Sequence, residues 1–549
     1  MRDLFATRNR NPNFTGRKVL LKELQTALES GKNVALIGPN GTGKSQIADE
    51  HARLRVTDYN FRFWVRADDP AVLLSDYAAL AEPLGIPYNE ESDLLEAAEA
   101  VKNWLEQNRR WLLVFDDATS PKTLKHYLPG ETSGHVIITS ANPIWENVAQ
   151  PMDVGALDRT EASELLRKIT GQEDSQAPNA LAEILGDLPL ALDLAGSYIK
   201  WTGVNISKYL DLYKERLIHP EMGKSEVPNE VKAVWAISFE QLQAVSQEGV
   251  DLIELLAFLA PEDIPFDILK ENSELLAEAL ELGFLALTRR GLIKSNERSV
   301  SIHPRVQTLA LGLLDTEAQK TWIEATLQAM GSAFSANLDN LDTWPECARI
   351  LPHVIKASEH AERLESGTQA TSSLLNQVGL FLHRRGDVSG AKLMLERLLV
   401  IDEIVYGPDH PEVGIDLNNL GGVLRLLGDL KGAKAMFERS LAIEESASES
   451  DPLKIAVRAN NLGTVLRALG DLESAKAMFE RALVIDERSY GPNHFKTAVR
   501  LNNLGEVFQE MGEVDMARKN YQRALTIFQQ FLGPGHQYTQ LARRNLNSL

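Results

Sequence analysis

The residues with the clearest chemical signature form a short glycine-rich segment near the start of the chain. It reads Gly38-Pro39-Asn40-Gly41-Thr42-Gly43-Lys44-Ser45. This fits the pattern G-x-x-x-x-G-K-S/T between an apolar run at 33–37 and a helical stretch at 46–52, which is the context of a phosphate-binding loop. Such glycines let backbone N–H groups converge on phosphate, while Lys44 reaches the β- and γ-phosphates and Ser45 holds Mg²⁺. The loop, with Gln46 after it, is therefore predicted to bind ADP or ATP.

A second pair of candidate residues follows another apolar run, 112–115, which ends in Asp116-Asp117. A phosphate loop needs a further carboxylate for the metal, so Asp116 is predicted to hold Mg²⁺ together with Ser45. Asp117 is predicted to polarise a water for attack on the γ-phosphate, which makes Lys44, Asp116 and Asp117 the candidate catalytic set. The alternative for Asp117 is an ordinary turn or N-cap residue.

The elements that must hold these residues are a set of short apolar strands alternating with helical stretches. The strands are expected at 33–37, 61–65, 111–115 and 135–139. Near-continuous apolar strands between helices indicate a parallel sheet covered on both faces. From 157 to about 373 the periodicity is helical, except for a small hairpin expected at 291–293 and 299–302. The fold class is multidomain, α/β followed by all-α.

The last third of the chain is a repeat. Glycines followed by an acidic residue recur every 42 residues, at Gly386, Gly428, Gly470 and Gly512. Each copy predicts a helical hairpin, because the glycine ends one helix and the acidic residue caps the next. The pattern resembles the tetratricopeptide repeat, and its longer period resembles the repeats of kinesin light chain, so residues 374–549 are expected to form an α-solenoid of four hairpins and a capping helix.

Asparagine pairs recur in the middle of the first helix of successive repeats. They are Asn418-Asn419, Asn460-Asn461 and Asn502-Asn503. By resemblance to kinesin light chain, they are predicted to clamp a peptide backbone in a groove. Arg458 and Arg500 stand three residues before an asparagine and are predicted to share its face, which favours an acidic peptide. The alternative is that the asparagines only tie neighbouring repeats together.

Further motifs resemble the NB-ARC family, within the signal-transduction ATPases with numerous domains. The resemblance rests on residues 13–17, the phosphate loop, Asp116-Asp117, 138–140, 185–192, 235–239 and 301–307. It implies a P-loop NTPase core followed by helical and winged-helix subdomains. It also implies that Gly16 and Arg17 lie by the adenine and ribose, that Pro189 packs on the adenine, and that His303 meets the β-phosphate of ADP. Plain alternatives are a helix start for Pro189, a surface cation for Arg17 and a satisfied buried histidine for His303.

One departure from that family bears on catalysis. The family usually has an arginine after Thr-Ser at the end of the fourth strand, whereas this chain has Ala141. Loss of a cation that stabilises transition-state charge costs orders of magnitude in rate. At most a slow ATPase is therefore expected, unless Arg66 or a neighbouring subunit supplies the charge.

Composition restricts the partners. The 57 Lys+Arg against 77 Asp+Glu give a net charge of −20, so direct nucleic-acid binding is not expected without a local basic patch. The N-terminal residues lack the apolar segment of a secretion signal, and no apolar stretch is long enough to cross a bilayer. With Cys347 as the single cysteine, these features predict a cytoplasmic protein with no membrane association.

The predicted organisation runs from a core to a solenoid. It comprises a P-loop NTPase core at 1–155, a helical subdomain at 156–215, a winged helix at 216–312, a helical bridge at 313–373 and the repeats at 374–549. The leading hypothesis is a switch that holds ADP when closed, senses a protein or peptide ligand through the repeats, exchanges to ATP, opens and oligomerises. Because only about ten residues precede the core, the output is expected through oligomerisation or another chain. The alternatives are a peptide-binding adaptor with a structural nucleotide module, and a transcription regulator.

Overall fold

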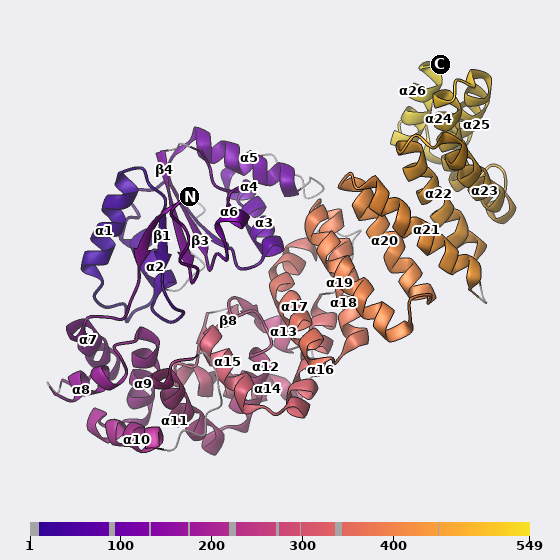
Figure 1. Cartoon of the computed structure of the whole chain (residues 1–549). Helices are drawn as coiled ribbons and strands as arrows, with labels where there is room; N and C mark the ends of the chain where they lie inside the picture. Colours follow the sequence, from indigo (N-terminus) through magenta and orange to yellow (C-terminus); the bar gives the residue numbers. More distant parts are fainter. Residues whose placement is uncertain are drawn as a thin grey trace. The chain divides into compact units, whose positions relative to one another are not determined.

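The computed structural model describes most of the chain. The described residues are 10–86, 94–130, 133–173, 176–218, 227–270, 274–296, 298–334, 343–447 and 450–549. By their internal contacts the residues divide into two compact units, one formed by 1–374 with 384–387 and the other by 375–383 with 388–549 (Figure 1). Among the described residues, no helix is long and apolar enough to span a membrane.

The first unit contains a five-stranded sheet whose strands are all parallel. Its strands are β1 (Val34–Ile37), β2 (Phe61–Arg66), β3 (Arg109–Asp116), β4 (Ser133–Ser140) and β5 (Gln150–Asp153), in the order β2-β3-β4-β1-β5. The parallel sheet expected from the sequence is thus present. Strand β5 was not predicted, because it contains Pro151 and has only one buried residue, as suits an edge strand.

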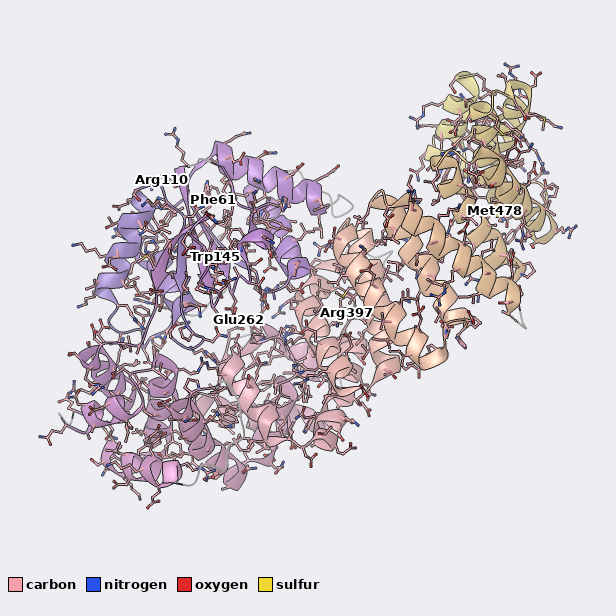
Figure 2. All side chains as sticks on the ribbon, in the orientation of Figure 1. Phe61, Arg110, Trp145, Glu262, Arg397 and Met478 are labelled. Atoms are coloured by element: carbon pink, nitrogen blue, oxygen red, sulfur yellow. The ribbon has the colours of Figure 1, made fainter. Side chains whose placement is uncertain are left out.

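Helices cover both faces of this sheet, as Figure 1 shows. On one face α1 (Lys18–Glu29) and α2 (Lys44–Leu54) pack on the apolar residues of β1 and β3. On the other face α3 (Pro70–Ala79), α4 (Ala81–Leu84) and α5 (Leu94–Gln107) build a larger core that includes Trp145 (Figure 2). The short α6 (Pro121–Leu124) contributes the buried Leu124. The carboxyl ends of β1, β3 and β4 therefore meet at one edge, where ligands bind in open parallel sheets.

Helices dominate the rest of the first unit. They are α7 (Arg159–Thr170), α8 (Ala177–Ile184), α9 (Pro189–Thr202), α10 (Ile206–Ile218), α11 (Asn229–Val245), α12 (Gln247–Leu256), α13 (Phe266–Lys270), α14 (Glu274–Arg289), α15 (Pro304–Leu313), α16 (Thr316–Ala333) and α17 (Trp344–Leu364). An antiparallel sheet of β6 (Ile264–Pro265), β8 (Ser299–Ile302) and β7 (Ile293–Ser295) lies among them. The expected hairpin is β7–β8, and the two-residue β6 is too short to be read from the sequence.

The C-terminal part of the chain consists of helical hairpins (Figure 1). They are α18 (Thr368–Arg384) with α19 (Val388–Tyr406), α20 (Pro411–Leu426) with α21 (Leu430–Ser446), α22 (Pro452–Ala468) with α23 (Leu472–Tyr490), and α24 (Phe495–Glu510) with α25 (Val514–Leu532), followed by α26 (Gln537–Asn547). Gly428 adopts a left-handed φ of 80° where α20 ends, and the carboxylate of Asp429 accepts from the Gly432 N–H at 2.9 Å to cap α21. Asp471 caps α23 in the same way, whereas Glu513 before α25 makes no side-chain cap.

Small residues bring the two helices of a hairpin together. A β-carbon at Gly421 would lie only 2.9 Å from the ring of Phe437, and one at Gly505 only 2.5 Å from Tyr521. Glycine at these positions therefore lets a buried aromatic ring pack directly against the backbone of the neighbouring helix.

Candidate functional site

The glycine-rich segment forms a tight loop between the end of β1 and the start of α2. A β-carbon at Gly38 would lie 2.3 Å from the carbonyl oxygen of Val154, so only glycine fits where the loop begins. Gly41 and Gly43 have left-handed φ angles of 90° and 93°, and α2 begins at Lys44. The hydroxyl of the buried Thr42 donates to the Pro39 carbonyl at 2.9 Å and closes the turn. The loop conformation thus places the first N–H groups of α2 beside the predicted phosphate site.

The two residues predicted to hold a metal lie together at the carboxyl edge of the sheet. The hydroxyl of Ser45 donates to Oδ1 of Asp116 at 2.7 Å, and the hydroxyl of Thr139 on β4 donates to the same oxygen at 2.5 Å. Asp116 is almost completely buried at the end of β3. This places a hydroxyl and a carboxylate oxygen side by side, and hard oxygen donors of this kind suit Mg²⁺.

The side chain of Lys44 is folded back over the loop. Its Nζ donates to the carbonyl oxygen of Gly38 at 2.9 Å, and it lies 3.3 Å from the carbonyl of Pro39 and from Oδ1 of Asn40. Burial lowers the pKa of Lys44, and Asp117 opposes this. The ammonium group is therefore held within the loop by neutral oxygens, which leaves its charge available to an anion.

Gln46 follows in the first turn of α2. Its Oε1 is buried and has no hydrogen-bond partner among the described residues. The predicted nucleotide contact of Gln46 remains a prediction.

Asp117 lies at the same edge, in a strained conformation. Its φ is 58°, and its N–H donates to the Thr139 hydroxyl at 2.9 Å. The side chain of Asp117 is exposed. Partial desolvation by the surrounding protein, and then the adjacent charge of Asp116, raise its pKa to about 6, although Lys44 opposes the shift. Glu262, which precedes β6, adds to this negative charge (Figure 2). The carboxylate of Asp117 is thus a weak base next to the predicted Mg²⁺ ligands.

Gly16 and Arg17 are anchored by a residue that the sequence did not single out. A β-carbon at Gly16 would overlap the carboxyl group of Glu161 on α7, and the N–H of Arg17 donates to that carboxylate at 2.8 Å. The guanidinium of Arg17 donates to the carbonyls of Gly155 at 2.6 Å and of Thr42 at 3.2 Å. Arg17 therefore links the phosphate loop to the segment after β5 and is not a free surface cation.

Helix α9 reaches the phosphate loop from the other side. Pro189 occupies the first position of α9, and the next residue, Leu190, would lie 3.3 Å from a β-carbon at Gly41. Pro189 thus has the helix-start role, and the residue that follows it lies beside the loop. Its predicted contact with adenine remains a prediction.

His303 caps α15 close to the loop. Its Nδ1 accepts from the N–H of Arg305 at 3.1 Å, so this nitrogen carries no proton. Burial, and after it the charges of Lys294 and Arg305, lower the pKa of His303 to about 3. The ring is therefore neutral near pH 7, and Nε2–H is its remaining donor.

The charge missing at Ala141 is not supplied by Arg66 in this structure. Arg66 forms a two-pronged ion pair with Asp76, with both N–O distances at 2.8 Å. A carboxylate thus already compensates this guanidinium, and moving it to a phosphate would leave Asp76 without its partner.

The asparagines of the repeats form a ladder from one repeat to the next. Nδ2 of Asn461 donates to Oδ1 of Asn418 at 2.9 Å, and Nδ2 of Asn503 donates to Oδ1 of Asn460 at 2.8 Å. Longer hydrogen bonds of the same kind run from Nδ2 of Asn545 to Oδ1 of Asn502 at 3.2 Å and from Nδ2 of Asn419 to Oδ1 of Asn376 at 3.5 Å. These amides therefore form hydrogen bonds between neighbouring repeats, as the alternative interpretation expects, while peptide clamping by the asparagines remains a prediction.

The arginines predicted to line an acidic-peptide groove are buried instead. Arg458 is 3% exposed and pairs with the buried Glu444. Arg500 is 6% exposed and its Nε lies 3.0 Å from the carboxylate of Asp486. The prediction of open cationic side chains was wrong, because each arginine neutralises an acid from the preceding helix, and exposing it would strand a buried charge. These residues give no basis for a preference for acidic peptides.

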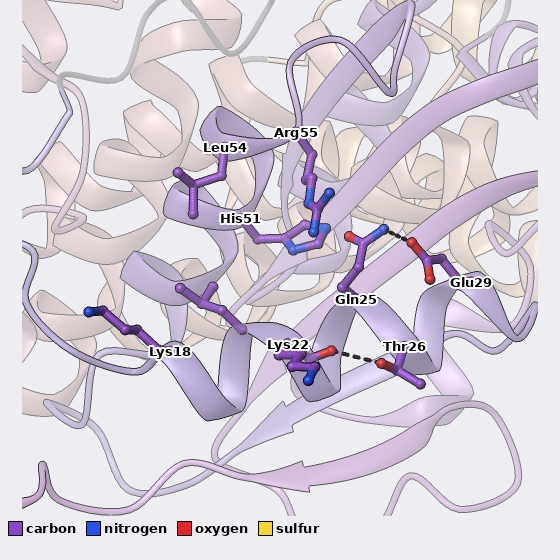
Figure 3. Close-up of a pocket in the computed structure, with 9 residues that line it drawn as sticks. Lys18, Lys22, Gln25, Thr26, Glu29, His51, Leu54 and Arg55 are labelled. Atoms are coloured by element: carbon purple, nitrogen blue, oxygen red, sulfur yellow. Dashed lines mark hydrogen bonds between the residues drawn. The ribbon is translucent and has the colours of Figure 1, made fainter.

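A separate hollow lies between α1 and α2 (Figure 3). It has a volume of about 430 Å³, and Gln25, His51 and Arg55 converge in it. Its lining includes none of the residues 38–45. The hollow is therefore separate from the predicted phosphate site at the edge of the sheet.

Three site residues were missed by reasoning from the sequence. Thr139 belonged to a recognised Thr-Ser motif but was given no role, and Leu190 stood beside the predicted Pro189. Glu161, 144 residues from Arg17, gave no local signal. Thr139 and Leu190 therefore lie within sequence motifs that signalled the site, whereas Glu161 does not.

Comparison with sequence families identifies the repeats. The tetratricopeptide repeat family matches residues 352–446, 455–530 and 500–546. The C-terminal part of the chain therefore carries tetratricopeptide repeats, and the match starts within α17, before the predicted residue 374. No curated protein matches the sequence.

The solved structures that match this chain do so at low sequence identity and low TM-score. A signal-transduction ATPase with numerous domains from Pyrococcus horikoshii, which has a tetratricopeptide repeat sensor, is 16% identical; the alignment covers 98% of this chain and 86% of that one at a TM-score of 0.40. BtubC from P. vanneervenii is 19% identical over 39% of this chain and 84% of its own, with a TM-score of 0.33. A putative kinesin light chain from Podospora anserina is 15% identical over 38% and 98%, with a TM-score of 0.30. At these scores the likeness establishes no function.

Proposed function

We propose that this protein is a nucleotide-dependent switch whose tetratricopeptide repeats sense a protein partner. The observation that carries the proposal is the bond from Ser45 to Asp116, which joins a loop of phosphate-binding sequence to a strand-end carboxylate. The repeats add a protein-interaction module on the same chain. Together these support a P-loop NTPase core whose nucleotide state is linked to partner binding.

The residues present fit ADP or ATP with Mg²⁺. The N-terminus of α2, at Lys44, offers N–H groups to phosphate, and Ser45 with Asp116 offers oxygen ligands to the metal. The neutral His303 has one N–H donor left for a phosphate oxygen. Bound Mg²⁺ would neutralise phosphate charge, while the chain itself positions the phosphates and excludes water.

In the proposed switch, thermodynamic linkage couples partner binding to the nucleotide state. In the proposed closed state, ADP is held between the loop, α9 and α15, where the last two belong to the predicted helical and winged-helix subdomains. A partner on the repeats shifts the equilibrium only if it binds the open state more tightly than the closed one. Exchange to ATP, opening and oligomerisation are the proposed consequences.

Nucleotide retained by the purified protein tests the proposal directly. After denaturation, chromatography of the released small molecules is expected to show an adenine nucleotide from the parent and none from Lys44→Ala. Lys44→Ala removes the cation for the β- and γ-phosphates. The matched control is Lys32→Ala, an exposed lysine just before β1, which is expected to retain nucleotide.

Two results would contradict the proposal. One is a parent protein that neither retains nor binds an adenine nucleotide. The other is a Lys44→Ala protein that folds normally and retains as much nucleotide as the parent.

Ala141 and the ion pair of Arg66 with Asp76 favour a second candidate, an adaptor whose nucleotide is structural. Without the arginine that the related family has at position 141, hydrolysis is slow and the site need not cycle. This candidate predicts that partner capture by the repeats is unchanged in Lys44→Ala. A pull-down that compares the two proteins with the same partner separates an adaptor from a switch.

A further inference from the structure

Arg305 stands in the first turn of α15, with its side chain against the phosphate loop. A β-carbon at Gly41, at the tip of the loop, would lie 3.7 Å from Cδ of Arg305. Arg305 is also close enough to Lys44 and His303 for its charge to lower the pKa of both. The guanidinium group thus belongs to the surroundings of the phosphate site, although it comes from a segment some 260 residues further along the chain than Lys44.

Among the residues that the structure describes, no carboxylate compensates this guanidinium. Within the described ranges, Arg305 has no ion pair and no side-chain hydrogen bond, and burial alone lowers its pKa. The other arginines of the site differ, because Arg17 donates to backbone carbonyls and Arg66 pairs with Asp76. A half-buried cation without a partner costs free energy unless an anion joins it.

Positive charge from several elements converges on the same place. Lys44 is held at the start of α2, and Arg305 lies in the first turn of α15, where the helix dipole is also positive. The charges of Arg305 and Lys44 repel each other, while Asp117 and Asp116 offset the charge of Lys44 and, in the described part of the chain, no such carboxylate acts on Arg305. A phosphate group held by both cations would turn this repulsion into attraction.

We infer that Arg305 is a phosphate-binding residue, which contacts a terminal phosphate of the bound nucleotide and supplies a cation that Ala141 lacks. This inference rests on the proposed function. It also gives α15 a means to sense the nucleotide, because the segment that carries Arg305 is attracted to the loop only when phosphate is present. Loss of the phosphate contact would leave Arg305 and Lys44 in mutual repulsion.

The test measures ADP and ATP affinity by titration calorimetry on the full chain, for the parent and for Arg305→Gln, Arg305→Lys and Lys44→Ala. Arg305→Gln is expected to bind about 10- to 100-fold more weakly, the usual loss for a charge-assisted hydrogen bond. Arg305→Lys is expected to recover part of that loss. The matched control is Arg298→Gln, an exposed arginine between β7 and β8, which is expected to bind like the parent.

Thermal unfolding without nucleotide separates a ligand contact from a structural role. Because Arg305 repels Lys44, Arg305→Gln is expected to unfold at the same or a higher temperature than the parent when nucleotide is absent. Added ADP is then expected to raise its unfolding temperature less than that of the parent. A purely structural arginine would instead lower the stability of the nucleotide-free protein.

The results of these titrations distinguish a failure of the inference about Arg305 from a failure of the proposed function. Equal losses for ADP and ATP assign the contact to the β-phosphate, and a larger loss for ATP assigns it to the γ-phosphate. Parent-like affinity of Arg305→Gln for both nucleotides, with Lys44→Ala defective, overturns the inference and leaves the nucleotide switch standing. A parent protein that binds neither nucleotide overturns both.

Discussion

Charge at the carboxyl edge of the sheet is arranged residue by residue. Asp116 accepts from two hydroxyls, those of Ser45 and Thr139, which fixes the carboxylate and satisfies it in the absence of a metal. The carboxylate of Asp117 accepts a hydrogen bond from neither of these hydroxyls, and its pKa is raised. Two adjacent carboxylates thus differ in basicity, which favours a structural and metal-binding role for Asp116 and a proton-accepting role for Asp117.

The role of Asp117 is tested by substitution and by pH. If Asp117 accepts a proton during hydrolysis, Asp117→Asn is expected to lower the slow ATPase rate by about 10²- to 10⁴-fold while ADP still binds. The folded-state pKa is raised to about 6, so the carboxylate form, and with it the rate, is expected to fall as the pH drops through 6. A rate that is unchanged in Asp117→Asn would leave Asp117 a turn residue only.

At the scale of the repeat, the buried pair of residues at one equivalent position differs in charge from one repeat to the next. Arg458 pairs with Glu444, and Arg500 pairs with Asp486. One repeat earlier, the corresponding residues are both acidic, Asp416 and Asp402. Both are buried, they share a hydrogen bond, and burial followed by the charge of Asp402 raises the pKa of Asp416 to about 8. The contact between α19 and α20 therefore contains an acid pair where the later repeats have ion pairs.

This acid pair predicts a pH-dependent stability. A folded-state pKa above the ordinary value of 3.8 means that the folded protein binds the proton more tightly. The stability that this proton confers is present at low pH and is lost as the pH rises through about 8. Urea denaturation of the parent is therefore expected to show a lower free energy of unfolding at pH 9 than at pH 6.

Substitution of Asp416 checks the cause. Asp416→Arg would recreate the ion pair of the later repeats and is expected to stabilise the protein at pH 9 by more than about 1.4 kcal/mol, the equivalent of one pKa unit. Asp416→Asn removes the titrating group without adding charge and is expected to flatten the pH dependence. A pH dependence that persists in both variants would place its origin elsewhere.

At the scale of the whole molecule, the predicted nucleotide-binding edge and most of the tetratricopeptide repeats lie in different compact units. Each unit has its own buried core, so the local geometry of the predicted site does not depend on the repeats. Communication between them must then come from an equilibrium between states, in which nucleotide and partner have different preferences.

The proposed switch predicts a nucleotide-dependent assembly. Light scattering coupled to size exclusion is expected to give a larger particle mass for the parent with partner and a non-hydrolysable ATP analogue than with ADP. Lys44→Ala is expected to show the ADP-like mass in both conditions, because it binds neither nucleotide well. An unchanged mass in all conditions would exclude ATP-driven oligomerisation and would favour the adaptor.

The sequence by itself determined the features that depend on residues close together in the chain. The phosphate loop is contiguous, from Gly38 to Ser45, and its glycines must come in that order for backbone N–H groups to converge. The hairpins of the repeats follow in the same way from glycine and an acidic cap at fixed spacing. Strand β5 escaped prediction because an edge strand that contains proline has no apolar run.

Only the tertiary structure decided which distant side chains meet. The spacing in the sequence placed Arg458 on the same helix face as an asparagine. Spacing does not tell whether that face meets solvent or a neighbouring helix. In the structure Arg458 is buried, because it pairs with Glu444 of the preceding helix. In the same way Arg305 approaches Gly41 only because the segment after β8 folds back over the loop. Helical periodicity fixes directions within one element, whereas the partner of a charge depends on how elements pack, and that information is not local.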